Sequence, residues 1–241
     1  MFVALRILAI RRTGSDLGDG KVSVPGDTPR LFAATAVPML MISVVLPFSF
    51  QSGRLILSWF SDAQQMAIFS ASFVSFLPVF SIAQVSGRSL WGDFARDRSI
   101  GLDSSLRFIS SMKLGALLGG VCGAGLVLVG SRVSEFAVSG TVVVPQSIFW
   151  ILGVLVFVQA IHLPSGMYLT DASGLRFQAV TSGLMCIFVV LASILGSSLL
   201  GAVGPVLALA VGMIVFQFIP CLVKAIRLLQ SARLDLMSRS R

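Results

Sequence analysis

The chain has 241 residues, of which 56% are hydrophobic and only 12% are charged. Soluble domains carry about 25% charged residues, so this chain has roughly half the usual share. Together with a mean hydropathy of +0.95, the composition excludes a disordered protein, a coiled coil and an ordinary cytosolic enzyme. It is typical of an all-α polytopic membrane protein.

The net charge of +8 would suggest a nucleic-acid partner in a soluble protein. Here we expect none, because basic residues also collect in the cytoplasmic loops of membrane proteins. The 15 Arg, three Lys and no Asn favour a GC-rich bacterial source, and hence a bacterial plasma membrane. Cys122, Cys186 and Cys221 lie in apolar runs without a C-x-x-C pair, so we expect small core residues rather than metal ligands.

The first 30 residues are predicted to form an apolar stub, too short to cross a bilayer, and a polar loop on the cytoplasmic side. Uncharged runs of about 20 residues then predict a six-helix transmembrane bundle over residues 31–228. A run of 47 uncharged residues, 177–223, holds two spans, because Gly and Pro punctuate it between Gly196 and Pro205. The predicted spans are about 32–60, 63–87, 108–131, 146–170, 176–198 and 203–226.

Two further segments lie outside these spans. Residues 86–107 carry mixed charges with Trp91 near their start, and we expect a cytoplasmic loop there. Residues 229–241 are predicted to form a basic cytoplasmic tail that continues the last span along the membrane surface.

The distribution of basic residues predicts the orientation of the bundle. If the N-terminus is cytoplasmic, 16 of the 18 basic residues lie in inner segments, and only Arg54 and Arg132 lie in outer ones. This bias favours both termini on the cytoplasmic side, since inner loops carry an excess of Lys and Arg.

Arg54 is the first candidate site residue. The helix that contains it is longer than the hydrocarbon core requires, so Arg54 is expected in the outer half of the membrane or at its outer face. An Arg there is costly in lipid, and its donors suit a phosphate or a carboxylate in a wet cavity. The alternative is an interfacial Arg that snorkels to lipid headgroups.

Gln159 and His162 are the second candidate site. They are three residues apart and share a helix face, so they could line one polar cavity. A His within a span is a functional candidate, and the alternative is a His hydrogen-bonded to a neighbouring helix. No carboxylate or Cys is close in sequence, so we expect no metal.

Small residues recur in the third span at Gly115, Gly119 and Gly123. Such spacing lets another helix approach closely. We expect packing within the bundle, with a dimer interface as the alternative. Prolines lie in the first, second, fourth and last spans, which favours helices that bend.

The chain offers little material for enzymatic catalysis. It has one Tyr and one His, and it contains no phosphate-binding G-x-x-x-x-G-K-[ST] loop, no zinc-protease motif and no G-x-S-x-G motif. We expect a transporter rather than an enzyme, with no cofactor.

Two runs resemble a known family: Ser52-Gly-Arg-Leu-Ile-Leu-Ser-Trp-Phe-Ser-Asp, continuing to Phe73, and Leu163-Pro-Ser-Gly-Met-Tyr-Leu-Thr-Asp, continuing to Gln178. They are similar to hairpins in the second lobe of polysaccharide flippases, within the multidrug/oligosaccharidyl-lipid/polysaccharide exporter superfamily. The resemblance covers about residues 31–228. It departs from the family at Gly53, where an Asp is usual before the Arg.

Family members have two six-helix lobes that face a central cavity. The resemblance therefore implies that this chain forms one MATE-like lobe and needs a second lobe or a second copy of itself. It implies transport of lipid-linked oligosaccharide or polysaccharide precursors, with membrane lipids as neighbours and Arg54 as a substrate contact. Two alternatives stay open: a drug or cation antiporter of the same superfamily, and a non-transporting scaffold or gene fragment.

The orientation can be tested by cysteine labelling from either side of the membrane. In intact cells, Ser61→Cys and Ser139→Cys should react with an impermeant thiol reagent, because both follow outward-running spans. Ser99→Cys should react only after permeabilisation. Labelling of Ser99→Cys in intact cells would contradict the predicted orientation with both termini in the cytoplasm.

Overall fold

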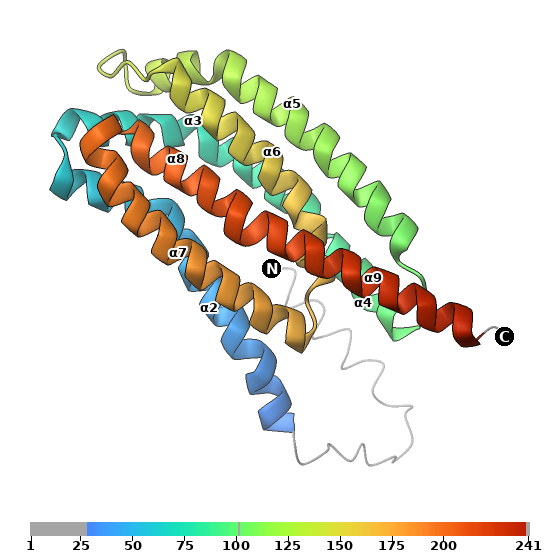
Figure 1. Ribbon diagram of the computed structural model, residues 1–241. Coiled ribbons are helices and arrows are strands. Elements are labelled where there is room, and N and C mark those ends of the chain that lie inside the picture. Colours follow the sequence, from blue (N-terminus) through green and yellow to red (C-terminus); the bar gives the residue numbers. More distant parts are fainter. Residues whose placement is uncertain (1–27, 101, 240–241) are drawn as a thin grey trace, which may run out of the picture. The chain divides into compact units, whose positions relative to one another are not determined.

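The computed structural model describes residues 28–100 and 102–239, with side chains over 33–100 and 102–233 (Figure 1). These residues are helical apart from short turns and contain no strand. Six helical segments are long and apolar enough to cross a bilayer. The predicted all-helical fold with six such segments is confirmed, and its assignment to a MATE-like lobe stays a prediction. The predicted stub and most of the loop over 1–30 lie outside the described residues.

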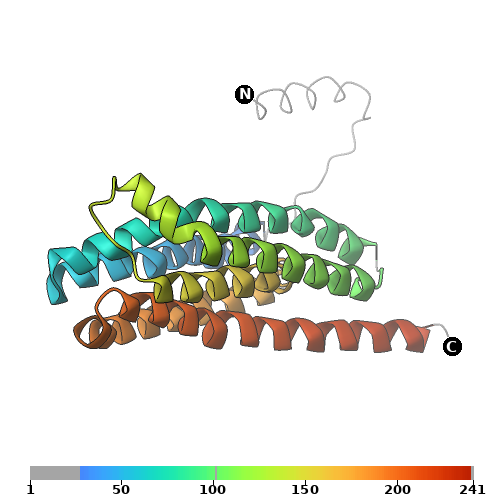
Figure 2. The same ribbon diagram turned by 90° about the horizontal axis from the view of Figure 1, so that it is seen from above.

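The six segments follow one another along the chain with short connections. The first five are α2 (Thr28–Phe60), α3 (Ala63–Arg88), α5 (Ser105–Ala137), α6 (Gln146–Tyr168) and α7 (Ala172–Leu200). The sixth is one unbroken rod, made of α8 (Val203–Gly212), a π-helix η1 (Met213–Phe218) and α9 (Ile219–Arg239), and Figure 2 shows it along one side of the bundle.

The prediction of a loop over residues 86–107 is wrong for most of that range. Helix α3 continues to Arg88, and a short helix, α4 (Leu90–Ser99), follows at once. Phe94 anchors α4, because its ring is buried and meets Tyr168 edge-on at 5.5 Å between centroids. The buried carboxylate of Asp97 also pairs with Arg107 Nε at 2.9 Å. A few buried contacts therefore hold a segment that composition alone marks as polar.

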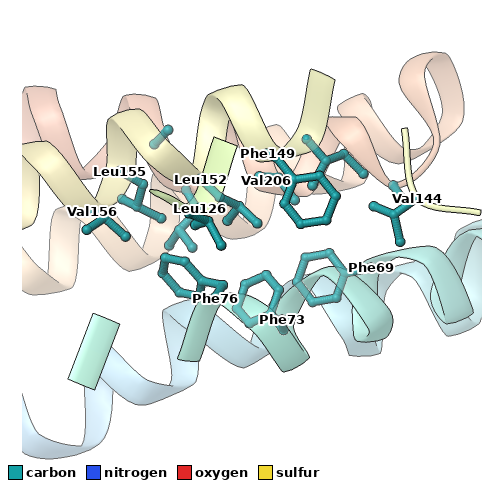
Figure 3. Close-up of a cluster of buried hydrophobic side chains, with 14 of the residues drawn as sticks. Phe69, Phe73, Phe76, Leu126, Val144, Phe149, Leu152, Leu155, Val156 and Val206 are labelled. Carbon is teal, nitrogen blue, oxygen red and sulfur yellow. The ribbon is translucent and has the colours of Figure 1, made fainter. Parts of the chain in front are cut away.

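Helix α6 lies at the centre of the bundle, between α3 and α5 on one side and the last span on the other (Figure 1). On α3, the rings of Phe69 and Phe73 stack at 4.4 Å between centroids, and Phe73 meets Phe76 at 5.1 Å. Figure 3 shows these three rings pointing toward Phe149 and Leu152 of α6, which are fully buried. This apolar core holds the N-terminal half of α6 in place.

The glycines of α5 let α5 and α6 approach closely. A Cβ at Gly115 would lie 2.6 Å from the carbonyl oxygen of Ala160, and one at Gly123 would lie 2.7 Å from that of Gly153. Pro164 has no N–H, so the Ala160 carbonyl lacks its usual helical donor and is free to face the neighbouring helix. The small residues therefore serve packing within the bundle, as predicted.

The hairpin between α7 and α8 needs glycine at one position. Gly201 has a positive φ of 56°, a conformation that other residues adopt only at a cost. Next to it, the N–H of Ala202 donates to Gln65 Oε1 of α3 at 2.8 Å. The break predicted between Gly196 and Pro205 thus falls at residues 201 and 202.

The close approach of α5 and α6 predicts a sharp contrast between two glycines of α5. Gly123→Ala should destabilise the protein by about 1–3 kcal/mol, because the new methyl group overlaps the Gly153 carbonyl. Gly120→Ala is the matched control, since a Cβ there meets nothing within 4 Å. Thermal unfolding of the purified variants in one detergent measures both. Equal stability of the two variants would contradict this account of the interface.

Candidate functional site

Two adjoining cavities lie between α2, α3 and α6, and elements of the last two spans close them. Their volumes are about 670 and 480 Å³. The first reaches η1, and the second reaches α7 and the start of α4. Both are lined by Ile42, Ser43, Leu46, Gln84, Arg88, Gln159 and His162.

The lining is polar in an otherwise apolar bundle. Gln84, Arg88, Gln159 and His162 line both cavities. Further glutamines add amides: Gln51 and Gln217 in the first cavity, and Gln178 in the second. Among the described lining residues, Arg88 carries the single fixed charge, and none is a carboxylate. The cavities therefore have a positive end and neutral amide walls.

Gln159 and His162 form the floor of this site. Each side chain is only 6% exposed. Within the described part of the chain, Gln159 Oε1 and His162 Nδ1 have no hydrogen-bond partner. Leaving such groups unpaired costs free energy, so the pair suits a bound ligand or water. The structure thus brings together the two residues that the sequence placed on one helix face.

Neighbouring amides around His162 are held by their own hydrogen bonds. Gln178 Nε2 donates to the carbonyl oxygens of Leu169 at 2.7 Å and Gly166 at 3.2 Å. Its Oε1 is therefore left as an acceptor, and a Cβ at Gly166 would lie 3.5 Å from both this oxygen and His162 Nε2. The His162 imidazole and the Gln178 amide oxygen therefore both lie next to Gly166.

On the opposite wall, Gln217 is buried in the π-helix η1. Its Nε2 donates to Ser182 Oγ of α7 at 2.8 Å. Pro220, the second residue of α9, lacks an N–H, which disturbs the regular helical bonding before it. Such π-helical turns are frequent at functional sites, and this one contains the two residues, Met213 and Gln217, that line the first cavity.

The cavities open between α2 and α3. Their rim is formed by exposed residues at helical spacing, Ser43, Pro47 and Gln51 on α2 and Ser81, Val85 and Arg88 on α3. Residues three and four apart share a helix face, so each helix presents one edge to the opening. A ligand can therefore enter from the side of the bundle.

Arg54 does not join Gln159 and His162 in these cavities. It is exposed and makes no ion pair or hydrogen bond with the residues that the structure describes. Arg54 lies three residues after Gln51, about 4.5 Å along the helix axis. It therefore lies on the same face of α2 as Gln51, nearer the C-terminal end of the helix. The preceding Gly53 is a packing residue, because a Cβ there would lie 2.8 Å from Pro205 Cβ and 2.9 Å from Phe69 Cζ. A larger side chain at position 53 would therefore not fit.

Sequence reasoning missed Gln84, Arg88, Gln178 and Gln217. Arg88 is one of the 16 basic residues that predict the orientation, and it also lies one helical turn after Gln84 on the same face. The signal that could have found them is the placement of glutamine in spans that are otherwise apolar. Which of these amides converge depends on how the helices pack, and the sequence does not contain that information directly.

The end of α6 next to the second cavity is fixed by polar contacts. Arg98 of α4 donates to the Tyr168 carbonyl oxygen at 3.0 Å and to Thr170 Oγ1 at 2.9 Å. Asp171 caps α7 and accepts from the N–H groups of Ser173 and Gly174. Burial raises the pKa of the Asp171 carboxyl, but hydrogen bonds from the Ser173 hydroxyl and these N–H groups hold the pKa below its ordinary value.

Comparison with family models, with curated proteins and with solved structures finds no match to this chain. The resemblance to polysaccharide flippases therefore rests on the two sequence runs around Arg54 and Leu163.

The site geometry predicts that the cavities contain water. In a background without native cysteines, Ser43→Cys should react with a water-soluble thiol reagent, because Ser43 lines both cavities. Val44→Cys is the control, since Val44 is 61% exposed on the apolar surface but lines neither cavity. A thiol in hydrocarbon reacts poorly because the thiolate is the reactive form. Equal reaction of the two cysteines would contradict a hydrated site.

Proposed function

We propose that this chain moves lipid-linked oligosaccharide or polysaccharide precursors across a bacterial plasma membrane, as one half of a two-lobed carrier. One observation carries the proposal: a cavity inside a bundle of apolar helices has a single fixed cation, Arg88, and amide walls without a described carboxylate. Such a lining favours a ligand that is anionic at one point and otherwise polar.

The charged part of this ligand fits Arg88. A guanidinium presents several donors in a planar fork that matches a phosphate or diphosphate. Arg88 is exposed at the rim and has no partner among the described residues, so its donors are available. Gln159, His162 and the neighbouring glutamines supply donors and acceptors for the hydroxyl groups of a sugar.

The lipid part of the ligand would stay in the bilayer. The opening between α2 and α3 lets a headgroup enter sideways while its chains remain among membrane lipids. Ile42, Leu46 and Leu77 line this opening with apolar surface. With both termini cytoplasmic, Arg88 lies toward the inner end of the site and Arg54 toward the outer end, where it would contact the substrate after the headgroup has crossed.

A second lobe, or a second copy of this chain, would complete the carrier. Gln51 and Arg54 are exposed on one edge of α2, and polar groups facing hydrocarbon are costly. The end of α2 that carries Gln51 and Arg54 is therefore the surface that a partner would cover. The glycine face of α5 is already occupied by α6.

The antiporter alternative has less support from the site. A carrier for cationic drugs usually needs a carboxylate within the membrane, and the described lining of both cavities has none. A non-transporting scaffold would not need unpaired polar atoms in its interior, where they cost stability.

Export of the glycan tests the proposal with three arginine variants and a fourth as the control. Arg88→Ala should reduce export at least tenfold, which corresponds to about 1.4 kcal/mol of lost binding, and Arg88→Lys should reduce it partially. Arg54→Ala should also reduce export, while Arg96→Ala is the control, because Arg96 is exposed on α4 and lines neither cavity. Export is measured beside membrane abundance, in cells that contain both lobes. Wild-type export by both Arg88→Ala and Arg54→Ala would refute the proposal.

A further inference from the structure

We propose that His162 is a proton-binding residue, and that its protonation strengthens the binding of an anionic headgroup in the cavity. This inference rests on the proposed function, since it concerns the same site. It assigns to His162 a role beyond contact with the substrate: the uptake of one proton from water when the anion binds and its return to water when the anion leaves.

The first support is that packing does not explain this imidazole. A structural His in a protein interior is normally fixed by a hydrogen bond to a ring nitrogen. In the described structure His162 Nδ1 has no partner, and the nearby Ser165 hydroxyl bonds to the His162 backbone carbonyl at 2.7 Å rather than to the ring. The ring nonetheless lines both cavities, so water and ligand can reach it.

The second support is the chemistry of the groups that face the ring. Gln178 Oε1 is left as an acceptor and, like His162 Nε2, would lie 3.5 Å from a Cβ at Gly166, while the unpaired Gln159 Oε1 lies on the same face of α6 as His162. A protonated imidazole donates from both nitrogens, so these acceptors favour the protonated ring. Arg88 opposes it by charge repulsion when the site is empty.

The remaining neighbours of α6 do not change this balance. The polar groups that line the first cavity from α2, α3 and η1 are Ser43, Gln51, Ser81, Gln84, Arg88 and Gln217, and of these only Arg88 is charged. Charged and titratable groups elsewhere around α6 lie outside the cavities. Asp97 binds Arg107, Arg98 binds Tyr168 and Thr170, Lys224 binds Ser173 and lies over the Phe177 ring, and Cys221 and Tyr168 lie in a separate apolar cluster. Lys113 of α5 and Arg176 of α7 are exposed and line neither cavity.

An anionic ligand therefore supplies what the empty site lacks. Its negative charge offsets Arg88 and attracts a second positive charge at His162. By linkage, a proton that binds more tightly in the presence of the anion must also make the anion bind more tightly. The affinity should then rise as the pH falls through the titration midpoint of the His162 imidazole.

The single His of the chain makes a test without any variant possible. The full chain, purified without a polyhistidine tag and labelled selectively at histidine, should show one imidazole NMR signal. We expect its titration midpoint to move to higher pH by about one unit when dihexanoylphosphatidylglycerol is added. The phosphodiester of this probe keeps one negative charge throughout, so only the protein titrates. Dihexanoylphosphatidylcholine, which has no net charge, should leave the midpoint unchanged.

Calorimetry with the same probe gives the second readout. The wild-type chain should bind more tightly as the pH falls through the imidazole midpoint, by up to about tenfold for a one-unit shift of that midpoint, and should take up a fraction of a proton in buffers of different ionisation enthalpy. His162→Gln should bind without pH dependence, and Arg88→Gln should bind more weakly at every pH but keep the dependence. If the probe binds while neither the midpoint nor the affinity responds, the proton role is wrong and the proposed function stands. If the probe does not bind at any pH, both are wrong.

Discussion

The absence of hydrogen-bond partners in hydrocarbon governs how this chain places its polar groups. Most hydroxyl groups within the spans bond to a carbonyl of their own helix, as Ser72 does to Phe69 and Ser165 to His162. Five glutamines, His162 and Arg88 instead line the cavities between α2, α3 and α6, where water or a ligand can satisfy them.

Helix α6 connects this polar site to the packing of the bundle. One side of α6 offers Gly153 and Ala160 to the glycines of α5, and the adjoining side carries Gln159 and His162. Because backbone-to-backbone contact leaves little freedom, α5 fixes the position of α6. The floor of the cavity is thereby held by a rigid interface, while α2, which has few buried residues, forms the more exposed wall.

The spans could be predicted from sequence because hydrocarbon thickness sets a length and apolar runs reveal it. The glycine face of α5 and the hairpin near Gly201 could also be predicted, because the spacing of small residues and the position of Gly and Pro are visible within a few residues of sequence. Helix α4 could not be predicted, because contacts outside the helix stabilise it. Phe94 packs against Tyr168, and Asp97 pairs with Arg107. The site was predictable only where its members share one helix, as Gln159 and His162 do. Arg88 and Gln217 join them through packing between helices.

The central claim is that the cavity selects an anionic headgroup. The most direct measurement compares two amphiphiles with the same tail and opposite charge, dodecyl phosphate and dodecyltrimethylammonium, for binding to the purified full chain in a neutral detergent. The account predicts at least tenfold tighter binding of the phosphate, because Arg88 is the fixed charge of a lining without a described carboxylate. Equal binding of the two, or tighter binding of the ammonium compound, would contradict it.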